Sequence, residues 1–501
     1  MRILLFCVPL ALGAALWVPT PDTTDVEDYA ARITPERLRE FVSVLAHDSL
    51  EGRETGTRGQ RKAAEYIRAH FEKIGLKGPV DDGYFQTLEL YRAEPGEIYV
   101  KAGGKIFHHT GKVVYQGKAD SGGEVTVPLV YAGYGREEDF NTLDVEGKAV
   151  LIRIADGRLY NLPEVSRARQ RGAKMVFIWS IDNEREFDDL AYRERVSLRG
   201  ERPSLEKPRI YAPNAGSFVV APSVVNTLMG VSPEKLKAAA SEDPAKKPLT
   251  RIKPTTIAYR TEMKVVTTPT ENVLGLLEGT DLSDEVVVVT AHYDHIGISR
   301  GSRGDTINNG ADDDASGTAA VMQLAQAFAD AKRDGAGPRR SILFMTFTGE
   351  EKGLLGSAYY ADNPAVPMEK TVLNLNIDMI GRRDGDHKNS PPYVYIIGTG
   401  EKSSVLNKFS ERVNDKYCDL IFDYKYNDRD HPTRLFYRSD HWNFAKHGVP
   451  IIFYFDGLHE DYHKPSDEAD KIEYDLLAKR AQCVFYTAWE AANTDERIPV
   501  P

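Results

Sequence analysis

Cysteine is scarce in this sequence, with 3 in 501 residues, which excludes a small fold held together by many disulfides. Cys7 lies in an apolar N-terminal stretch, so only Cys418 and Cys483 concern the rest of the chain. Neither lies near another cysteine or a histidine at metal-ligand spacing, which argues against a zinc site built on thiolates. One disulfide between them and two buried free thiols are both open interpretations.

Positive charge is also in short supply. The chain has 64 Lys and Arg against 75 Asp and Glu, a formal net charge of -11 and a pI of about 5.7. Binding to nucleic-acid phosphates needs a basic surface, and no basic run interleaved with aromatic residues is present. We therefore expect no nucleic-acid partner.

Long apolar runs are absent except at residues 3–17, which follow Arg2. This run is short for a membrane span, and its small residues Gly13, Ala14 and Ala15 suit cleavage by signal peptidase. We predict a signal peptide at residues 1–20, a secreted or periplasmic protein, and a mature chain without a membrane span. The alternative is a weak N-terminal anchor.

The length predicts more than one core. Helical periodicity begins at Thr34 and Pro35, in an N-terminal segment spanning 27–90. Short β-like runs with glycine-rich turns at 91–254 predict an inserted, β-rich domain. From 255 to 495, continuous apolar strands alternate with helices, which predicts an α/β fold of three layers, with a mixed, mostly parallel sheet covered on both faces.

Polar residues that can bind metal lie on turns or just after the apolar strands of this last segment. In such sheets, ligands collect at the carboxyl ends of the strands. Two adjacent divalent ions need imidazoles and several carboxylates, one of them shared. The candidates are His292, Asp313, Glu351, Asp378 and His463.

The segment HYDH places Asp294 two residues after His292, on the same side of an extended chain. A carboxylate there could fix the tautomer of a metal-bound imidazole. In NNGADDDASG, one of three consecutive aspartates could bridge two ions, or the triplet could form a polar turn that caps the following helix. The pattern alone does not say which aspartate would bridge.

The pair Glu350–Glu351 ends a buried apolar strand, where unpaired charge is costly. One glutamate could bind metal while the other accepts a proton from water. A pair of solvent-facing carboxylates at a helix start is the alternative. For Asp378 the alternative is a structural hydrogen-bonding role, and for His463 the competing ligand is His459.

Several motifs, in order, resemble the di-zinc aminopeptidase family (metallopeptidase family 28). They are AHYDH, GADDDASGTAAV, TGEEKGLLGS, NIDMIG, SDHWNFAKHGVP and DYHKPSD, across residues 285–470, preceded by GRETGTRGQRKAAEYIRAHFEKIGL. The stretches GKAVLIRIADG and ARQRGAKMVFIWS resemble the protease-associated domain that many relatives carry as an insertion, in which we expect no catalytic residue.

The resemblance implies two Zn²⁺ ions and a role for each candidate. His292 and Asp378 would hold the first zinc, Glu351 and His463 the second, and Asp313 would bridge them. Glu350 would be the general base, Asp294 the carboxylate partner of His292, and Tyr462 a donor to the tetrahedral intermediate.

The implied function is a secreted aminopeptidase that acts on peptides or proteins through a zinc-activated water. A carboxypeptidase or dipeptidase is the first alternative, and it would need cationic residues that bind a carboxylate, which the sequence does not locate. A single-zinc glutaminyl cyclase is disfavoured by the presence of both His292 and the aspartate-rich loop. A receptor-like relative without activity is disfavoured because every ligand is present. The oligomeric state stays open.

Overall fold

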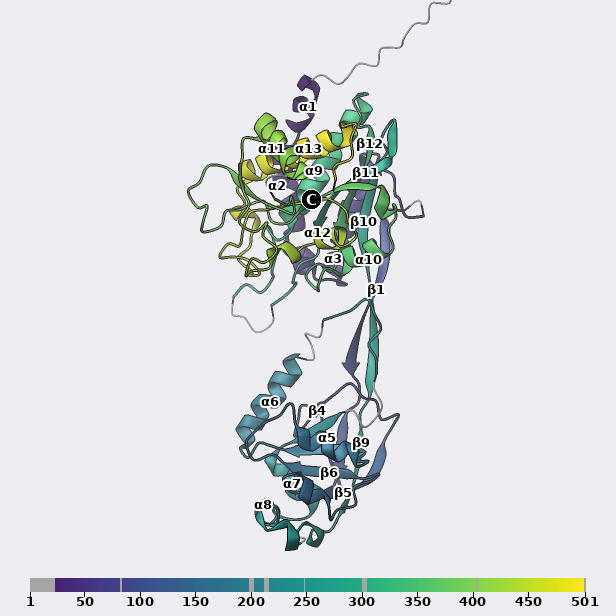
Figure 1. The fold of residues 1–501 in the computed structure, drawn as a ribbon, viewed down its shortest axis with the longest axis vertical. Helices are drawn as coiled ribbons and strands as arrows, with labels where there is room; N and C mark the ends of the chain where they lie inside the picture. The colour runs from purple at the N-terminus through teal and green to yellow at the C-terminus, as the bar shows by residue number, and fades with distance from the viewer. Residues whose placement is uncertain are drawn as a thin grey trace, which may run out of the picture. The chain divides into compact units, whose positions relative to one another are not determined.

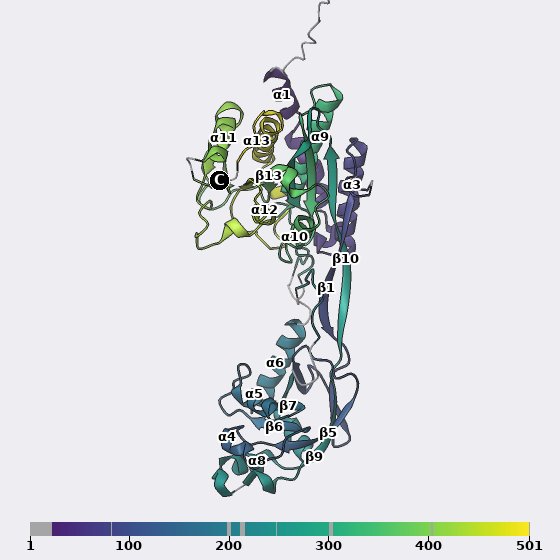
Figure 2. The same ribbon diagram turned by 45° about the vertical axis from the view of Figure 1, so that its right-hand side comes forward.

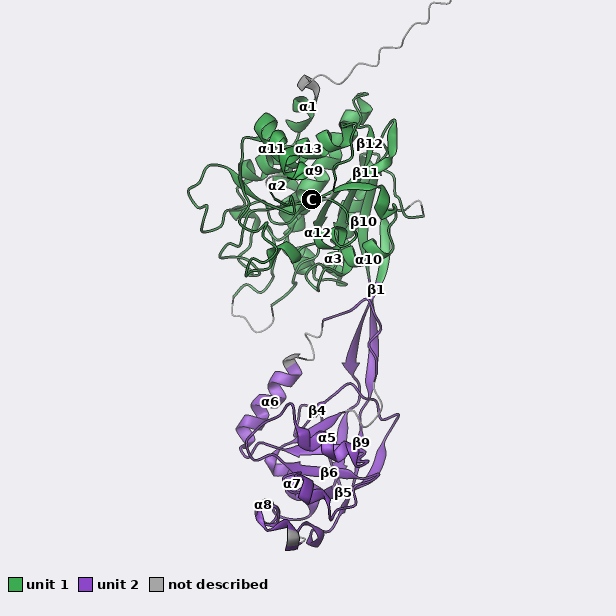
Figure 3. Cartoon of the chain, viewed as in Figure 1, with its two compact units in different colours: residues 1–88, 270–501 green, residues 89–269 purple. Residues whose placement is uncertain are grey.

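The computed structural model describes residues 23–81, 83–197, 202–210, 216–246, 248–299, 304–401 and 404–499, so the predicted signal peptide lies outside the described residues. The chain forms two compact units, Met1–Leu88 with Thr270–Pro501, and Glu89–Pro269 (Figure 3). Among the helices of the described residues, none is both long and apolar enough to cross a membrane.

The first unit contains an eight-stranded mixed sheet, as predicted. Its strands, in spatial order, are β1 (Phe85–Pro95), β10 (Met263–Leu277), β12 (Arg340–Phe347), β11 (Leu282–His292), β13 (Thr371–Ile377), β16 (Ile451–Phe455), β14 (Tyr393–Ile397) and β15 (Ile421–Asp423). The central strands β12, β11, β13 and β16 are all parallel to one another. Strands β10 and β14 join this central block in antiparallel fashion.

Helices cover both faces of this sheet, which makes three layers (Figures 1 and 2). Along β11, Val287 and Val289 pack into a core shared with α9 (Ala315–Arg333) and α13 (Tyr474–Asn493). The alternate residues Val286 and Val288 pack into a second core, which includes Tyr360 and Phe444. These two aromatic residues come from α10 (Leu355–Asp362) and α12 (His441–Ala445). Successive side chains of a strand point to opposite faces, so the apolar run is continuous because both faces are buried.

The N-terminal helices pack on the α9 and α13 side. They are α1 (Thr23–Ala30), α2 (Pro35–Leu45) and α3 (Arg58–Lys73), and α11 (Val405–Val413) also contributes to this core. The side chain of Thr34 accepts the Arg37 N–H, and Pro35 occupies the first helical position, so the predicted start of α2 is confirmed.

The second unit has its own mixed sheet and its own core. In spatial order the strands are β3 (Lys105–His108), β2 (Tyr99–Ala102), β9 (Thr255–Arg260), β5 (Val125–Tyr131), β6 (Ala149–Arg153), β7 (Met175–Trp179), β8 (Ser217–Val220) and β4 (Val113–Gln116). Its helices are α4 (Glu137–Phe140), α5 (Pro163–Gln170), α6 (Glu184–Ser197), α7 (Pro222–Met229) and α8 (Pro233–Ser241). Strands β5 to β8 run parallel, and a helix lies between each successive pair of them in the chain. This unit is therefore more helical and less hairpin-like than its glycine-rich turns suggest.

Cys418 and Cys483 form a disulfide, so of the two interpretations left open by the sequence the bonded one holds. Cys483 lies in α13, and Cys418 ends the turn that follows α11. Both residues are buried. The bond therefore ties two elements of the same core across 65 residues of chain.

Removing this disulfide should lower the stability of the folded state, because the unfolded chain gains conformational entropy. A closed loop of 65 residues predicts that Cys418→Ser/Cys483→Ser lowers the free energy of unfolding by about 4 kcal/mol, measured by urea denaturation. Reductant should shift the urea midpoint of the wild type and leave that of the double variant unchanged. An equal response of both proteins to reductant would contradict the assignment.

Candidate metal centre

The candidate site forms where the parallel strands end. His292 is the last residue of β11 and is paired with Phe347, the last residue of β12, and the glutamate pair follows three residues later. Ile377 ends β13 beside Tyr454 of β16, and Asp378 comes next in the chain. Because these strands are parallel neighbours, their carboxyl ends bring the candidates to one edge of the sheet.

Asp313 lies between two histidines. Its Oδ1 is 3.2 Å from His292 Nε2, and its Oδ2 is 3.1 Å from His463 Nε2. Asp378 Oδ1 is 3.6 Å from the same nitrogen of His292, and Glu351 Oε2 is 3.2 Å from that of His463. The five side chains therefore form two groups that share one carboxylate.

The neighbouring aspartates hold the backbone instead. Asp314 is the N-cap of α9, and its carboxylate accepts the N–H groups of Gly317, Met379 and His292. Asp312 accepts the N–H of Gly381. The carboxylate of Asp313 instead faces the two histidines, and Asp313 lines the cavity of the site. Capping, one of the two roles that the sequence left open, thus falls to Asp314, and the carboxylate of Asp313 is left available for a metal.

His295 belongs to this cluster, and sequence reasoning missed it. Its ring is fully buried, with Nδ1 2.8 Å from Glu351 Oε1 and 3.8 Å from Asp313 Oδ2. Alternation along an extended chain selects residues two apart, but β11 ends at His292, so that rule does not apply to His295. The second histidine of HYDH was the available signal.

Asp294 contacts His292 in a different way from the one predicted. His292 Nδ1 is 3.1 Å from the main-chain oxygen of Asp294, while the carboxylate is 3.9 Å away. The carboxylate instead accepts hydrogen bonds from Thr55 Oγ1 (2.7 Å) and from the N–H of Glu350 (3.1 Å). A main-chain carbonyl can fix the tautomer of a metal-ligating histidine equally well. The carboxylate of Asp294 holds the backbone of Glu350.

The imidazoles and carboxylates of the cluster shift one another's pKa values in opposite directions. Burial lowers the pKa of His463, but hydrogen bonds from its ring to Asp313 and Glu351 outweigh the effect of burial and raise this pKa to about 10. Burial also opposes charge on His292, yet Asp378 and Glu350 raise its pKa well above the usual value. Burial and Asp313 act to raise the pKa of Glu351, whereas hydrogen bonds from His295 and His463 lower it to about 2.

The donor set fits zinc. Imidazole nitrogens and carboxylate oxygens are common zinc ligands, and binding would displace the protons that the histidines otherwise carry. His295 Nε2 is buried without a hydrogen-bond partner, and the close polar neighbours of Asp313 Oδ2 and Glu351 Oε1 are imidazole nitrogens. Across the described parts of the chain, groups of metal-ligating side chains occur only here, as His292 with Asp314 and Asp378, and as His295 with Asp313 and Glu351. Because backbone N–H groups already engage Asp314, Asp313 is the better ligand.

The cavity beside this cluster has one polar and one apolar side. Glu350 and Tyr462 line it together with the cluster, and Arg438 lies at its rim. The apolar side is formed by Met379, Leu435, Phe453, Phe455 and Leu458. Asp440 and His441, from the SDHWNF motif, are fully buried and do not line the cavity.

Tyr462 and His463 enter the cavity as a pair. Their rings stack with centroids 3.9 Å apart. His463 has a φ of 56°, a conformation that is costly for a residue other than glycine and that surrounding contacts must maintain. The phenolic oxygen of Tyr462 accepts a hydrogen bond from Arg438 at 3.3 Å.

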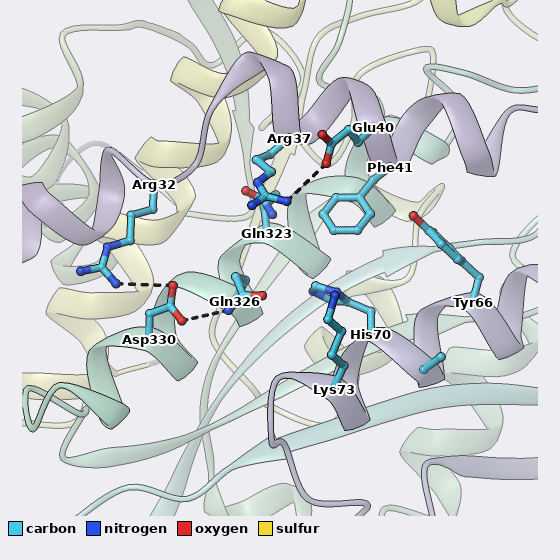
Figure 4. A pocket seen from close by; sticks show the side chains of 11 residues that line it. Arg32, Arg37, Glu40, Phe41, Tyr66, His70, Lys73, Gln323, Gln326 and Asp330 are labelled. Atoms are coloured by element: carbon cyan, nitrogen blue, oxygen red, sulfur yellow. Dashed lines mark hydrogen bonds and ion pairs between the residues drawn. The ribbon is translucent and has the colours of Figure 1, made fainter.

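A larger groove of about 590 Å³ lies between α2, α3 and α9, away from these residues (Figure 4). Four of its charged side chains form ion pairs, Arg32 with Asp330 and Arg37 with Glu40, each at 3.4 Å. It contains neither of the metal-ligating groups. We therefore assign function to the smaller cavity.

Residues 272–488 match the family model described as Peptidase family M28. An aminopeptidase of Bacillus subtilis, YwaD, is 26% identical over 382 residues, covering 74% of this chain and 68% of that protein. A probable glutamate carboxypeptidase of Arabidopsis thaliana is also 26% identical, over 67% of this chain and 54% of that protein. This chain thus spans only about half the length of some of its curated relatives.

Among solved structures, an aminopeptidase from Aneurinibacillus sp. strain AM-1 has a TM-score of 0.49 at 19% identity, covering 95% of this chain and 98% of that one. A zinc aminopeptidase from Bacillus subtilis has a TM-score of 0.48 at 20% identity, covering 93% and 98%. The segment that carries the cluster is therefore the part of the chain that matches Peptidase family M28, residues 272–488.

Zinc should stabilise the folded chain through Asp313. After treatment with a chelator, Zn²⁺ at a hundredfold excess over Kd should stabilise the wild type by about 2.7 kcal/mol, seen as a higher melting temperature by calorimetry. Asp313→Asn should lose most of this shift. Asp284→Asn, at a side chain that is 93% exposed, should keep it. An unchanged shift in Asp313→Asn would place the metal elsewhere.

Proposed function

We propose that this chain is a secreted di-zinc aminopeptidase. The observation that carries the proposal is Asp313, whose two carboxylate oxygens face His292 on one side and His463 on the other. A carboxylate shared between two donor groups is the arrangement that a pair of divalent ions requires. The family M28 match and the aminopeptidase relative support the same reaction class.

The distances around His292 and His463 divide the proposed ligands into two sets. His292 and Asp378 would hold one zinc, His463 and Glu351 the other, and Asp313 both. His295, beside Glu351, would orient that carboxylate or bind the second ion itself. Bound there, the ions would supply Lewis acidity toward a carbonyl oxygen and lower the pKa of a water molecule.

Glu350 is the proposed proton carrier. Its carboxylate faces the cavity, and Oε2 lies 4.0 Å from His292 Nε2, so it is close to the cluster without being shared by both groups. Burial, together with the negative charges of Glu351 and Asp378, raises its pKa well above the usual value. A base with a raised pKa can take a proton from water and pass it to the leaving amine. The hydrogen bond from the Glu350 N–H to Asp294 fixes its backbone for this task.

Tyr462 and the apolar wall would hold the substrate. Because the guanidinium of Arg438 can only donate, the phenolic oxygen accepts from it and its own proton is free to point into the cavity. That proton would stabilise an oxyanion on the scissile carbonyl. Phe453, Phe455 and Leu458 would accommodate an apolar side chain.

The location and the insertion stay part of the proposal. A buried disulfide between Cys418 and Cys483 suits an oxidising compartment, which supports export by the leader at residues 1–20. The described residues of the second unit contribute to neither metal-ligating group, in line with a protease-associated role in substrate access.

The two adjacent glutamates provide a matched test of their separate roles. Glu350→Gln should retain close to two zinc ions per chain by elemental analysis while hydrolysis of leucine p-nitroanilide falls at least 100-fold, because the general base is lost. Glu351→Gln, the same change one residue later, should lose zinc. Full activity in Glu350→Gln would refute the proton-transfer role, and zinc-free, active wild-type protein would refute the proposed function.

A further inference from the structure

Arg438 is presented to the cavity by a firmly held segment. It follows the short 3₁₀ helix Leu435–Tyr437 and precedes α12. The next residue, Ser439, is buried, and its hydroxyl accepts a hydrogen bond from Asn376 of β13 at 2.8 Å. The Arg438 N–H donates to the oxygen of Leu435. The backbone is thus fixed from both sides while the guanidinium is exposed at the rim.

The guanidinium of Arg438 has donors to spare. Its one hydrogen bond within the described residues goes to Tyr462, and it forms no ion pair with any described carboxylate. Arg382 and Arg383, by contrast, pair with Asp461 and Glu473. An arginine carries five N–H donors in a fork that matches a carboxylate. At this rim, a carboxylate partner would have to come from the substrate.

Charge at the site favours an anionic group. If two zinc ions are bound, as the proposed function holds, Arg438 adds a further positive charge at the rim of the cavity. A substrate carboxylate that reached it would gain a charge-assisted hydrogen bond, which is stronger than one to a neutral amide.

The short distance between Arg438 and Tyr462 identifies which carboxylate of the substrate Arg438 can reach. Arg438 lies 3.3 Å from the Tyr462 oxygen that would contact the scissile carbonyl. Consecutive Cα atoms are about 3.8 Å apart, so the main-chain carbonyl group of the residue after the scissile bond falls within reach of the guanidinium. In a dipeptide that group is the free C-terminal carboxylate, and in a longer peptide it is an amide.

We propose that Arg438 binds the C-terminal carboxylate of the substrate, and that the enzyme therefore prefers dipeptides with an apolar first residue. This inference rests on the proposed function and names its substrate class. Arg438 is then the cationic residue whose position the sequence did not reveal.

The test compares Leu-Gly with its C-terminal amide, Leu-Gly-NH₂, in the zinc-loaded full chain. The wild type should show kcat/KM about tenfold higher for the free acid, the difference between a charge-assisted and a neutral hydrogen bond. Arg438→Gln should bring this ratio to within about twofold of one, mainly by raising KM for the acid. Arg434→Gln is the matched control, because Arg434 carries the same charge four residues earlier, stacks on Tyr437 at 4.3 Å and does not line the cavity.

Three results would overturn the proposal. They are equal rates for acid and amide in the wild type, an unchanged ratio in Arg438→Gln with both rates reduced, and a stronger preference for Leu-Asp-NH₂, whose carboxylate is on the side chain. The second would mean that Arg438 acts through Tyr462.

Binding separates this inference from the proposed function. Calorimetric titration of Leu-Gly and Leu-Gly-NH₂ into zinc-loaded Glu350→Gln, with and without Arg438→Gln, needs no turnover. Acid-selective binding that depends on Arg438, without hydrolysis by the wild type, would refute the peptidase and leave the carboxylate site standing. Hydrolysis by the wild type, without selectivity for the free acid in the kinetics or in the titration, would support the peptidase and refute the carboxylate site.

Discussion

Repulsion among buried carboxylates at one edge of a parallel sheet is the constraint on which this structure depends. The loops that carry them are held by a buried arginine and by backbone N–H groups. Arg53, fully buried, donates to the main-chain oxygens of Tyr293, Asn309 and Gly310, and so ties the HYDH segment to the aspartate-rich loop. Burial lowers the pKa of Arg53, but the surrounding aspartates favour its charge. Such a scaffold allows acidic residues to face one another at a site that a metal can occupy.

Aspartates outside the cavity complete this support. Asp467 accepts the N–H groups of both Asp312 and Asp313, and Asp314 accepts three more from separate segments. These bonds leave Asp313 as the member of the triplet whose carboxylate is free to face both histidines. Similarly, Asp294 holds Glu350 through its N–H. The chemistry of each ligand thus depends on neighbours that would not themselves touch a metal.

Much of the fold followed from local pattern. Apolar runs predicted the central strands, and their ends predicted the convergence of His292, the glutamate pair and Asp378, because parallel strands share one carboxyl edge. Prediction failed where regular geometry stops. His295 lies beyond the last residue of β11, where alternation no longer says which way a side chain points. Arg438 reaches the rim from a short turn between buried residues, and no spacing rule relates it to Tyr462.

By itself, the sequence determined which strands form, which residue types gather at their ends, and that those types suit divalent metal. These follow from periodicity and composition, which are local. Only the tertiary structure decided that Asp313, and not Asp312 or Asp314, lies between two histidines, and that Cys418 meets Cys483. It also decided that Arg438 stands beside Tyr462 without a carboxylate partner among the described residues. Each of these depends on contacts between segments far apart in the chain, whose distances are set by packing of the whole core.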